Sequence, residues 1–273
     1  MRLLVTGGAG YLGSEVCALA VPRGWDVLAT QFHAPPPHGR AVRLDVRDAD
    51  AAQRAFLRHG PDVVVHTAYV QADSPTIVQG SAAVATAAHR GGARLVHLST
   101  DLVFDGEQGA PYGEDAEPRP VSAYGAAKLE AETVVARIDP GAVLVRTSLL
   151  YGKKPGPQEA LALRDGVQLF TDEIRCPTDV SELAAALLEL AELDVSGPLH
   201  LAAPEAVSRY ELGRLLRARH GGDPDEILGG PAPPRQGRAR NVALDSSRAA
   251  ALLSTRFRGV TEALEGPPSG HGG

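Results

Sequence analysis

Cysteine is scarce in this chain of 273 residues, where only Cys17 and Cys176 occur. The two lie far apart, and neither belongs to a CxxC pair or to the cysteine and histidine spacing of a metal site. We therefore expect two reduced thiols, in the core or at the surface, with no disulfide and no metal centre.

Long apolar runs and an excess of positive charge are also missing. No run approaches the roughly 20 apolar residues that cross a bilayer. Met1-Arg2 leads directly into a short apolar strand and then glycine, which differs from a signal peptide. The net charge of −6 and the pI near 5.8 argue against general binding to nucleic acid or to membrane surfaces. We expect a cytoplasmic protein with neither of these as a partner.

The remaining composition, 44% hydrophobic and 22% charged, is that of an ordinary globular protein with one large domain or two joined ones. Apolar runs alternate with helical patterns along the first 150 residues. The runs are continuous rather than alternating, which is typical of parallel strands buried on both faces. The sequence therefore predicts an α/β fold with a Rossmann-type doubly wound parallel sheet.

Three glycines follow the first predicted strand. Residues 2–13 read RLLVTGGAGYLG, and a helical pattern comes next. This GxxGxxG spacing is a variant of the dinucleotide-binding fingerprint. Gly7 permits the tight turn, Gly10 lets backbone amides approach a pyrophosphate, and Gly13 lets the helix pack closely on the strand. A plain glycine turn is the alternative. We expect five residues here to bind the cofactor: Gly7, Gly10, Tyr11, Leu12 and Gly13.

The second predicted strand, 26–30, bears on the choice of cofactor. It ends in Gln31-Phe32-His33, without the Asp or Glu that usually holds the ribose hydroxyls of NAD. His33, Arg40 and Arg43 could instead lie near a 2′-phosphate. The pattern admits NADP(H) or NAD(H) and favours NADP(H). Asp45 and Val46, after the next strand, are expected at the adenine, although Asp45 serves equally well as a turn residue.

Polar side chains follow two further apolar runs. The run 61–69 ends in Ala68 and Tyr69, which we expect over the cofactor. The run 93–98 leads into Ser99-Thr100-Asp101, where an open α/β sheet places its ligands. We expect Ser99 at the cofactor.

A tyrosine and a lysine follow in the stretch YGAAK, as Tyr124 and Lys128 on a predicted helix 121–137. The i, i+4 spacing puts both on one face of the helix. A nearby ammonium favours phenolate, so it lowers a tyrosine pKa from about 10 and makes the phenol a useful general acid. Lysine occurs only at 128, 153 and 154, which makes Lys128 more notable.

The pattern changes after Gly152, where a loop and several short segments begin. We expect an NAD(P)-binding domain at 1–152 that parts of 175–203 complete. A smaller C-terminal substrate-binding lobe is expected mainly at 153–265, and a disordered tail at 266–273. Arginines of the proline-rich turn in the lobe are candidates to clamp a diphosphate, with a solvated surface as the alternative: Arg235, Arg238 and Arg240.

Together GxxGxxG, STDLVFDG, YGAAK and RTSLLYG resemble the extended short-chain dehydrogenase/reductase superfamily. PTDVSELA (177–184) and VALDSSRA (242–249) are most similar to its dTDP-4-dehydrorhamnose reductase branch. The resemblance covers residues 2–255. It implies an NAD(P)H-dependent reductase of a nucleotide-linked 4-keto-6-deoxy sugar, with hydride delivered to the C4 ketone.

The resemblance also implies roles for individual residues. Thr100 (or Ser99) would hydrogen-bond the substrate oxygen, and Tyr124 would donate a proton to it. Lys128 would lower the pKa of Tyr124 and hold the nicotinamide ribose, so Tyr124 and Lys128 would contact the cofactor as well. Thr100, Asp101 and Tyr124 would bind the substrate.

The chain departs from the family pattern at Ile77, where the family often has an Asn that helps a proton relay. The segment 69–75 and the loop after Gly152 are also shorter. Two alternatives therefore stay open: a nucleotide-sugar epimerase or dehydratase that retains its cofactor, and a non-catalytic NADP-binding regulatory subunit. The oligomeric state is also open, including a homodimer.

Overall fold

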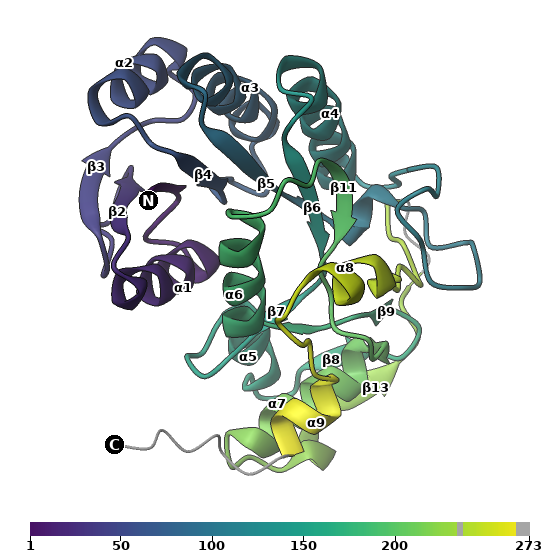
Figure 1. Ribbon diagram of the computed structural model, residues 1–273. Coiled ribbons are helices and arrows are strands. Elements are labelled where there is room, and N and C mark those ends of the chain that lie inside the picture. The colour runs from purple at the N-terminus through teal and green to yellow at the C-terminus, as the bar shows by residue number, and fades with distance from the viewer. Residues whose placement is uncertain (234–236, 266–273) are drawn as a thin grey trace.

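The structure is a computed structural model that describes residues 1–233 and 237–265. Within these residues seven parallel strands form the central sheet, in the order β11-β6-β5-β4-β1-β2-β3 (Figure 1). They are β1 (Arg2–Thr6), β2 (Asp26–Gln31), β3 (Arg40–Arg43), β4 (Val63–His66), β5 (Arg94–Thr100), β6 (Val143–Thr147) and β11 (Gly197–His200). The predicted Rossmann-type doubly wound sheet is confirmed.

Helices cover both faces of this sheet (Figure 1). One face packs against α2 (Ala49–His59), α3 (Ser74–Gly91) and α4 (Ala123–Ile138), and the other against α1 (Tyr11–Ala20), α6 (Val180–Leu190) and α8 (Ser247–Leu252). Neighbouring strand residues point to opposite faces, so Leu3 joins the core under α1 and α6 while Leu4 joins the core under α2 and α3. Burial on both faces explains the continuous apolar runs.

The remaining short elements gather at one end of the sheet (Figure 1). They surround a separate apolar core that includes Tyr151, Leu169, Leu212, Leu216 and Val260. These elements, which we call the C-terminal group, are β7 (Leu150–Tyr151), α5 (Pro157–Ala162), β8 (Gln168–Phe170), β9 (Ile174–Arg175), β10 (Thr178–Asp179), β12 (Val207–Ser208), α7 (Arg209–Arg219), η3 (Pro224–Glu226), β13 (Leu228–Gly230) and α9 (Val260–Glu265). By contrast α6 and β11, both within 175–203, belong to the central layers.

Element ends differ from the predictions by a few residues. The run expected at 61–69 is a strand only over 63–66, and the helix expected at 121–137 spans 123–138. Two short 3-10 helices, η1 (Val21–Arg23) and η2 (Asp101–Val103), follow α1 and β5. Arg235 and the tail 266–273, for which predictions were made, lie outside the described residues. Among 1–233 and 237–265, no helix combines the length and apolar character that crossing a bilayer requires.

Two histidines lie side by side in the sheet. His66 on β4 and His97 on β5 are register partners, are fully buried, and have ring centroids 5.3 Å apart. His66 hydrogen-bonds Thr6 Oγ1 at 2.6 Å and Ser81 Oγ at 3.2 Å, whereas neither ring nitrogen of His97 has a partner among the described residues. Burial lowers the pKa of His66 to about 3, and it lowers the pKa of His97 well below its ordinary value.

Acid should therefore weaken the fold. Below the ordinary histidine pKa of about 6.5, the unfolded chain binds protons that the folded chain does not, so stability falls as the pH falls. His66 alone should lower the free energy of unfolding by about 1.4 kcal/mol at about pH 5.5 relative to about pH 8. Urea unfolding at both pH values measures the loss, and His97→Leu should reduce it. An equal loss in the variant and the wild type would contradict a contribution from His97.

Candidate active site

A cleft of about 1140 Å³ lies where the carboxyl ends of the strands meet the C-terminal group. Its centre is the junction of β1 and β4, where the strand order reverses, which is the usual ligand site of an open α/β sheet. The volume slightly exceeds the ~300–1,000 Å³ of sites for one small ligand. Fourteen of the residues that the sequence places at the site line this one cleft: Gly7, Gly10, Tyr11, Leu12, Gly13, Asp45, Val46, Ala68, Tyr69, Ser99, Thr100, Asp101, Tyr124 and Lys128.

The glycine loop forms the floor of the cleft. Gly7 has φ = +68°, a conformation that side chains disfavour. A Cβ on Gly13 would lie 2.3 Å from the carbonyl oxygen of Gly7, so α1 approaches the loop as closely as only glycine allows. Gly10 precedes α1 and offers no side chain to cap it. The amides of the first turn of α1 are therefore available to an anion such as a pyrophosphate.

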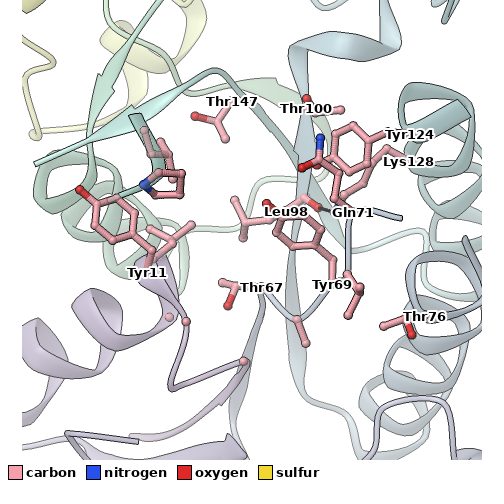
Figure 2. A pocket seen from close by; sticks show the side chains of 18 of the residues that line it. Tyr11, Thr67, Tyr69, Gln71, Thr76, Leu98, Thr100, Tyr124, Lys128 and Thr147 are labelled. Carbon is pink, nitrogen blue, oxygen red and sulfur yellow. Dashed lines mark hydrogen bonds between the residues drawn. The ribbon is translucent and has the colours of Figure 1, made fainter. Parts of the chain in front are cut away.

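Tyr11 links this loop to the C-terminal group across the cleft (Figure 2). Its phenol donates a hydrogen bond to the Lys154 carbonyl oxygen at 3.2 Å, and its ring lies so close to Gly156 that a Cβ there would be 2.6 Å away. The loop 152–156 is in turn fixed by the buried Glu159, whose carboxylate accepts bonds from the amides of Gly152 and Gly156 at 2.8 Å. The loop after Gly152 is thus held by contacts with Tyr11 and Glu159.

The part of the cleft lined by Asp45 and Val46, where the sequence analysis expects the adenine, matches the prediction only in part. His33 lines the cleft, whereas Arg40 and Arg43 do not. Arg47, which the sequence analysis did not single out, lines it instead and pairs with Asp45 at 2.8 Å. This contact lowers the pKa of Asp45.

Tyr124 and Lys128 project from α4 towards the end of β5, beside Thr100 (Figure 2). Helix α4 begins here because Ser122 caps it, accepting from the amide of Gly125 at 3.0 Å. Lys128 is 5% exposed, and its ammonium donates to the Leu98 carbonyl oxygen at 2.9 Å. The ammonium also lies 4.9 Å from the centroid of the Tyr69 ring, a cation–π distance.

The prediction that Lys128 lowers the pKa of Tyr124 is wrong for this structure. Burial raises the pKa of Tyr124, and Tyr69 and Asp101 add to the effect while the Thr100 hydroxyl opposes it. Burial also lowers the pKa of Lys128 to about 8, against the opposing carboxylate of Glu132. The lysine is itself costly to charge at this depth, so it does little for the phenol.

Two hydroxyls of the cleft are buried without a partner in the described chain, those of Ser99 and Thr147. A buried hydroxyl is costly to leave unbonded, so both are suited to a ligand's polar groups. Thr147 ends β6 just as Thr100 ends β5, so the rule that strand ends carry ligands could have identified it.

Several arginines of the C-terminal group line the cleft: Arg164, Arg175 and Arg209. Sequence reasoning missed these three, because nothing in their spacing distinguishes them from surface arginines. Of the arginines it proposed for a diphosphate, Arg238 and Arg240 do not line the cleft. Arg238 instead pairs with the buried Glu173.

Ile77 is buried on α3 and packs against Ala127 and Ala131 of α4. Thr76, the preceding residue, lines the cleft. Helix α4, which carries Tyr124 and Lys128, thus packs against the apolar side chain of Ile77, where the family often has Asn. Ile77 offers no side-chain donor or acceptor for a proton relay.

Residues 1–266 match the family model described as the RmlD substrate binding domain. The chain belongs to this family. It is 34% identical to dTDP-4-dehydrorhamnose reductase of Mycobacterium tuberculosis, over 83% of this chain and 78% of the relative. It is 30% identical to methionine adenosyltransferase 2 subunit beta of Danio rerio, over 77% of this chain and 71% of the relative. The predicted resemblance to the reductase branch is confirmed.

Solved structures similar to this RmlD-family chain agree in fold. A hypothetical dTDP-4-dehydrorhamnose reductase from Sulfolobus tokodaii has a TM-score of 0.83 and 28% identity, covering 94% of this chain and 97% of that one. The enzyme WbmG of Bordetella bronchiseptica, in complex with NAD, has a TM-score of 0.81 and 26% identity, covering 94% and 89%. The uncapped α1 turn and the glycine loop of the present chain fit a dinucleotide of this kind.

Gly13→Ala should weaken dinucleotide binding. The added Cβ would overlap the Gly7 carbonyl, and relieving such overpacking costs about 1–3 kcal/mol by moving the loop. We expect about tenfold weaker binding of reduced nicotinamide cofactor, measured by fluorescence titration. Gly91→Ala in α3 is the matched control, because a Cβ there meets no neighbouring atom within 4 Å. Equal affinities in the Gly13→Ala variant and the wild type would contradict the assignment of the glycine loop to dinucleotide binding.

Proposed function

We propose that this protein is an NAD(P)H-dependent reductase of a nucleotide-linked 4-keto-6-deoxy sugar, with hydride transferred to the C4 ketone. One observation carries the proposal: Thr100, Tyr124 and Lys128 lie together in the same cleft as the glycine loop. Membership in the RmlD family supports the same reaction and substrate class.

The reduced nicotinamide supplies the hydride, and the chain supplies alignment and a proton. Tyr124 donates its phenolic proton to the ketone oxygen as that oxygen gains negative charge. Its raised pKa keeps the phenol protonated, as a donor must be. The ammonium of Lys128 would hold the nicotinamide ribose.

The substrate's diphosphate would lie against the arginines of the C-terminal group. Arg164 and Arg209 line the cleft, and guanidinium groups bind phosphate oxygens bidentately. We assign substrate binding mainly to residues 153–265 on this basis. The sugar ring would then reach Thr100 and Tyr124, between the diphosphate and the cofactor.

Two features favour NADPH over NADH. Strand β2 ends in Gln31 without a carboxylate to hold ribose hydroxyls, and His33 lines the cleft next to it. Arg47 is close by but already pairs with Asp45. Assays should therefore run NADPH and NADH side by side.

Tyr124→Phe tests the reaction. The variant keeps the ring and loses the proton donor, so kcat should fall about 10²- to 10⁴-fold while cofactor affinity stays close to that of the wild type. The absorbance of reduced cofactor near ~340 nm reports turnover with a dTDP-4-keto-6-deoxy sugar. Tyr151→Phe is a matched control that should retain activity, because Tyr151 does not line the cleft and its hydroxyl has no partner among the described residues. Unchanged kcat in Tyr124→Phe would contradict the assignment.

The pH dependence should reflect Lys128. Its pKa is lowered to about 8, so the ammonium is lost as the pH rises through that value. We expect kcat/KM to fall above about pH 8 in the free enzyme. Neighbouring His66 and His97 are neutral there, and Glu132 is paired with Arg146 at 2.8 Å. A kcat/KM that stays level up to about pH 10 would contradict an essential ammonium.

A regulatory subunit is the second candidate. Ile77 takes the place of the family's relay Asn, and the chain is 30% identical to a methionine adenosyltransferase subunit. This alternative predicts cofactor binding without oxidation of any 4-keto-6-deoxy sugar tested, together with a stable protein partner. Oxidation that depends on Tyr124 excludes it.

A further inference from the structure

Asp101 lines the cleft, yet it is only 3% exposed. Its Oδ2 accepts a hydrogen bond from Ser148 Oγ at 2.6 Å and lies 3.9 Å from Nε of Arg175. Its Oδ1 accepts from Thr100 Oγ1 at 3.1 Å. Both oxygens of this carboxylate are thus engaged by the protein itself. This arrangement suits a residue that holds its neighbours better than one that binds a substrate.

The hydroxyl of Thr100 is held from two sides. It donates to Asp101 and accepts from the backbone amide of Leu102 at 3.2 Å. The direction of each bond follows from the groups, because an ionised carboxylate only accepts and an amide N–H only donates. The Thr100 side chain lies at the cleft wall near Tyr124 (Figure 2). Its oxygen is therefore fixed there, with its hydrogen directed at Asp101.

Contacts from the C-terminal group fix Asp101 in turn. Arg175, on β9, is 5% exposed and donates to the carbonyl oxygens of Ala239 and Arg240, at 2.9 Å each. Ser148 Oγ also accepts from the amide of Cys176 at 3.2 Å. A chain of buried polar contacts thus runs from the C-terminal group through Asp101 to Thr100.

We propose that Asp101 is a positioning residue that acts on the reaction through Thr100. Ser148, which follows β6, and Arg175 of the C-terminal group hold Asp101 in place. The proposal rests on the reductase function above and replaces the substrate-binding role that the resemblance implies for Asp101. Thr100 meets the ketone with its oxygen already in place, and only its hydrogen has to turn. Loss of Asp101 frees the Thr100 side chain and should lower kcat more than it raises KM.

A double-mutant cycle tests the proposal. Thr100→Val removes the hydroxyl at nearly constant shape, and Asp101→Asn keeps the size of the carboxylate. Asp101→Asn should lower kcat about 10- to 100-fold, the effect of a small misplacement at a reacting group. The sugar KM and the cofactor Kd should change less than about twofold. In the Thr100→Val background the same substitution should change kcat less than about twofold, since its target is gone.

Asp139→Asn is the matched control. This buried carboxylate lies at the other end of α4, about 22 Å of helix from Tyr124, and should leave kcat unchanged. Ser148→Ala, which removes one donor to Asp101, carries the same cycle should Asp101→Asn fail to fold. It should lower kcat in the wild-type background and leave it unchanged beside Thr100→Val.

Two results would overturn the role of Asp101 alone. One is an equal loss of kcat in both backgrounds, and the other is a raised sugar KM at constant kcat, which indicates a substrate ligand. A wild type that binds reduced cofactor without oxidising it would instead overturn the reductase function, and the role of Asp101 with it.

Discussion

The close approach of α1 to the end of β1 governs the architecture of the cleft. A Cβ at Gly13 would meet the Gly7 carbonyl at 2.3 Å, so the helix can reach this position only with glycine there. That approach points the first turn of α1 at the junction of β1 and β4 and places Tyr11 against the loop 152–156. One steric constraint near the start of the chain therefore sets both the anion-binding floor and the contact with the C-terminal group.

The chemistry of the cleft depends on burial more than on charge pairing. Lys128 and Asp101 are 5% and 3% exposed, and in each case burial shifts the pKa towards the neutral form. Each is then held by polar groups, Lys128 by the Leu98 carbonyl and Asp101 by hydroxyls and an arginine. Such groups are costly to bury but keep fixed positions once satisfied. The protein thus accepts the cost of burying these groups, and in return their positions are fixed before the substrate binds.

Sequence patterns predicted the parts of the site that depend on local rules. Strand ends, the glycine spacing and the i, i+4 pair each bring side chains to one edge of the sheet, so residues as distant as Gly10 and Tyr124 were found together. The sequence did not predict the arginines at 164, 175 and 209 as part of the site, because only the tertiary packing of short elements puts them at the cleft. The raised pKa of Tyr124 could not be predicted for the same reason, since neither its burial nor the Tyr69 ring 5.9 Å away is visible in the spacing of the sequence.

Ile77, where the family often has Asn, is accommodated by apolar packing between α3 and α4. Its side chain joins Ala127 and Ala131 in an apolar contact between α3 and α4, and α4 carries the tyrosine and the lysine of the site. A polar group there would have to be satisfied between two helices, whereas isoleucine fills the space without that requirement. The contact fixes the helix, and any proton that returns to Tyr124 has to travel by a route that does not involve this side chain.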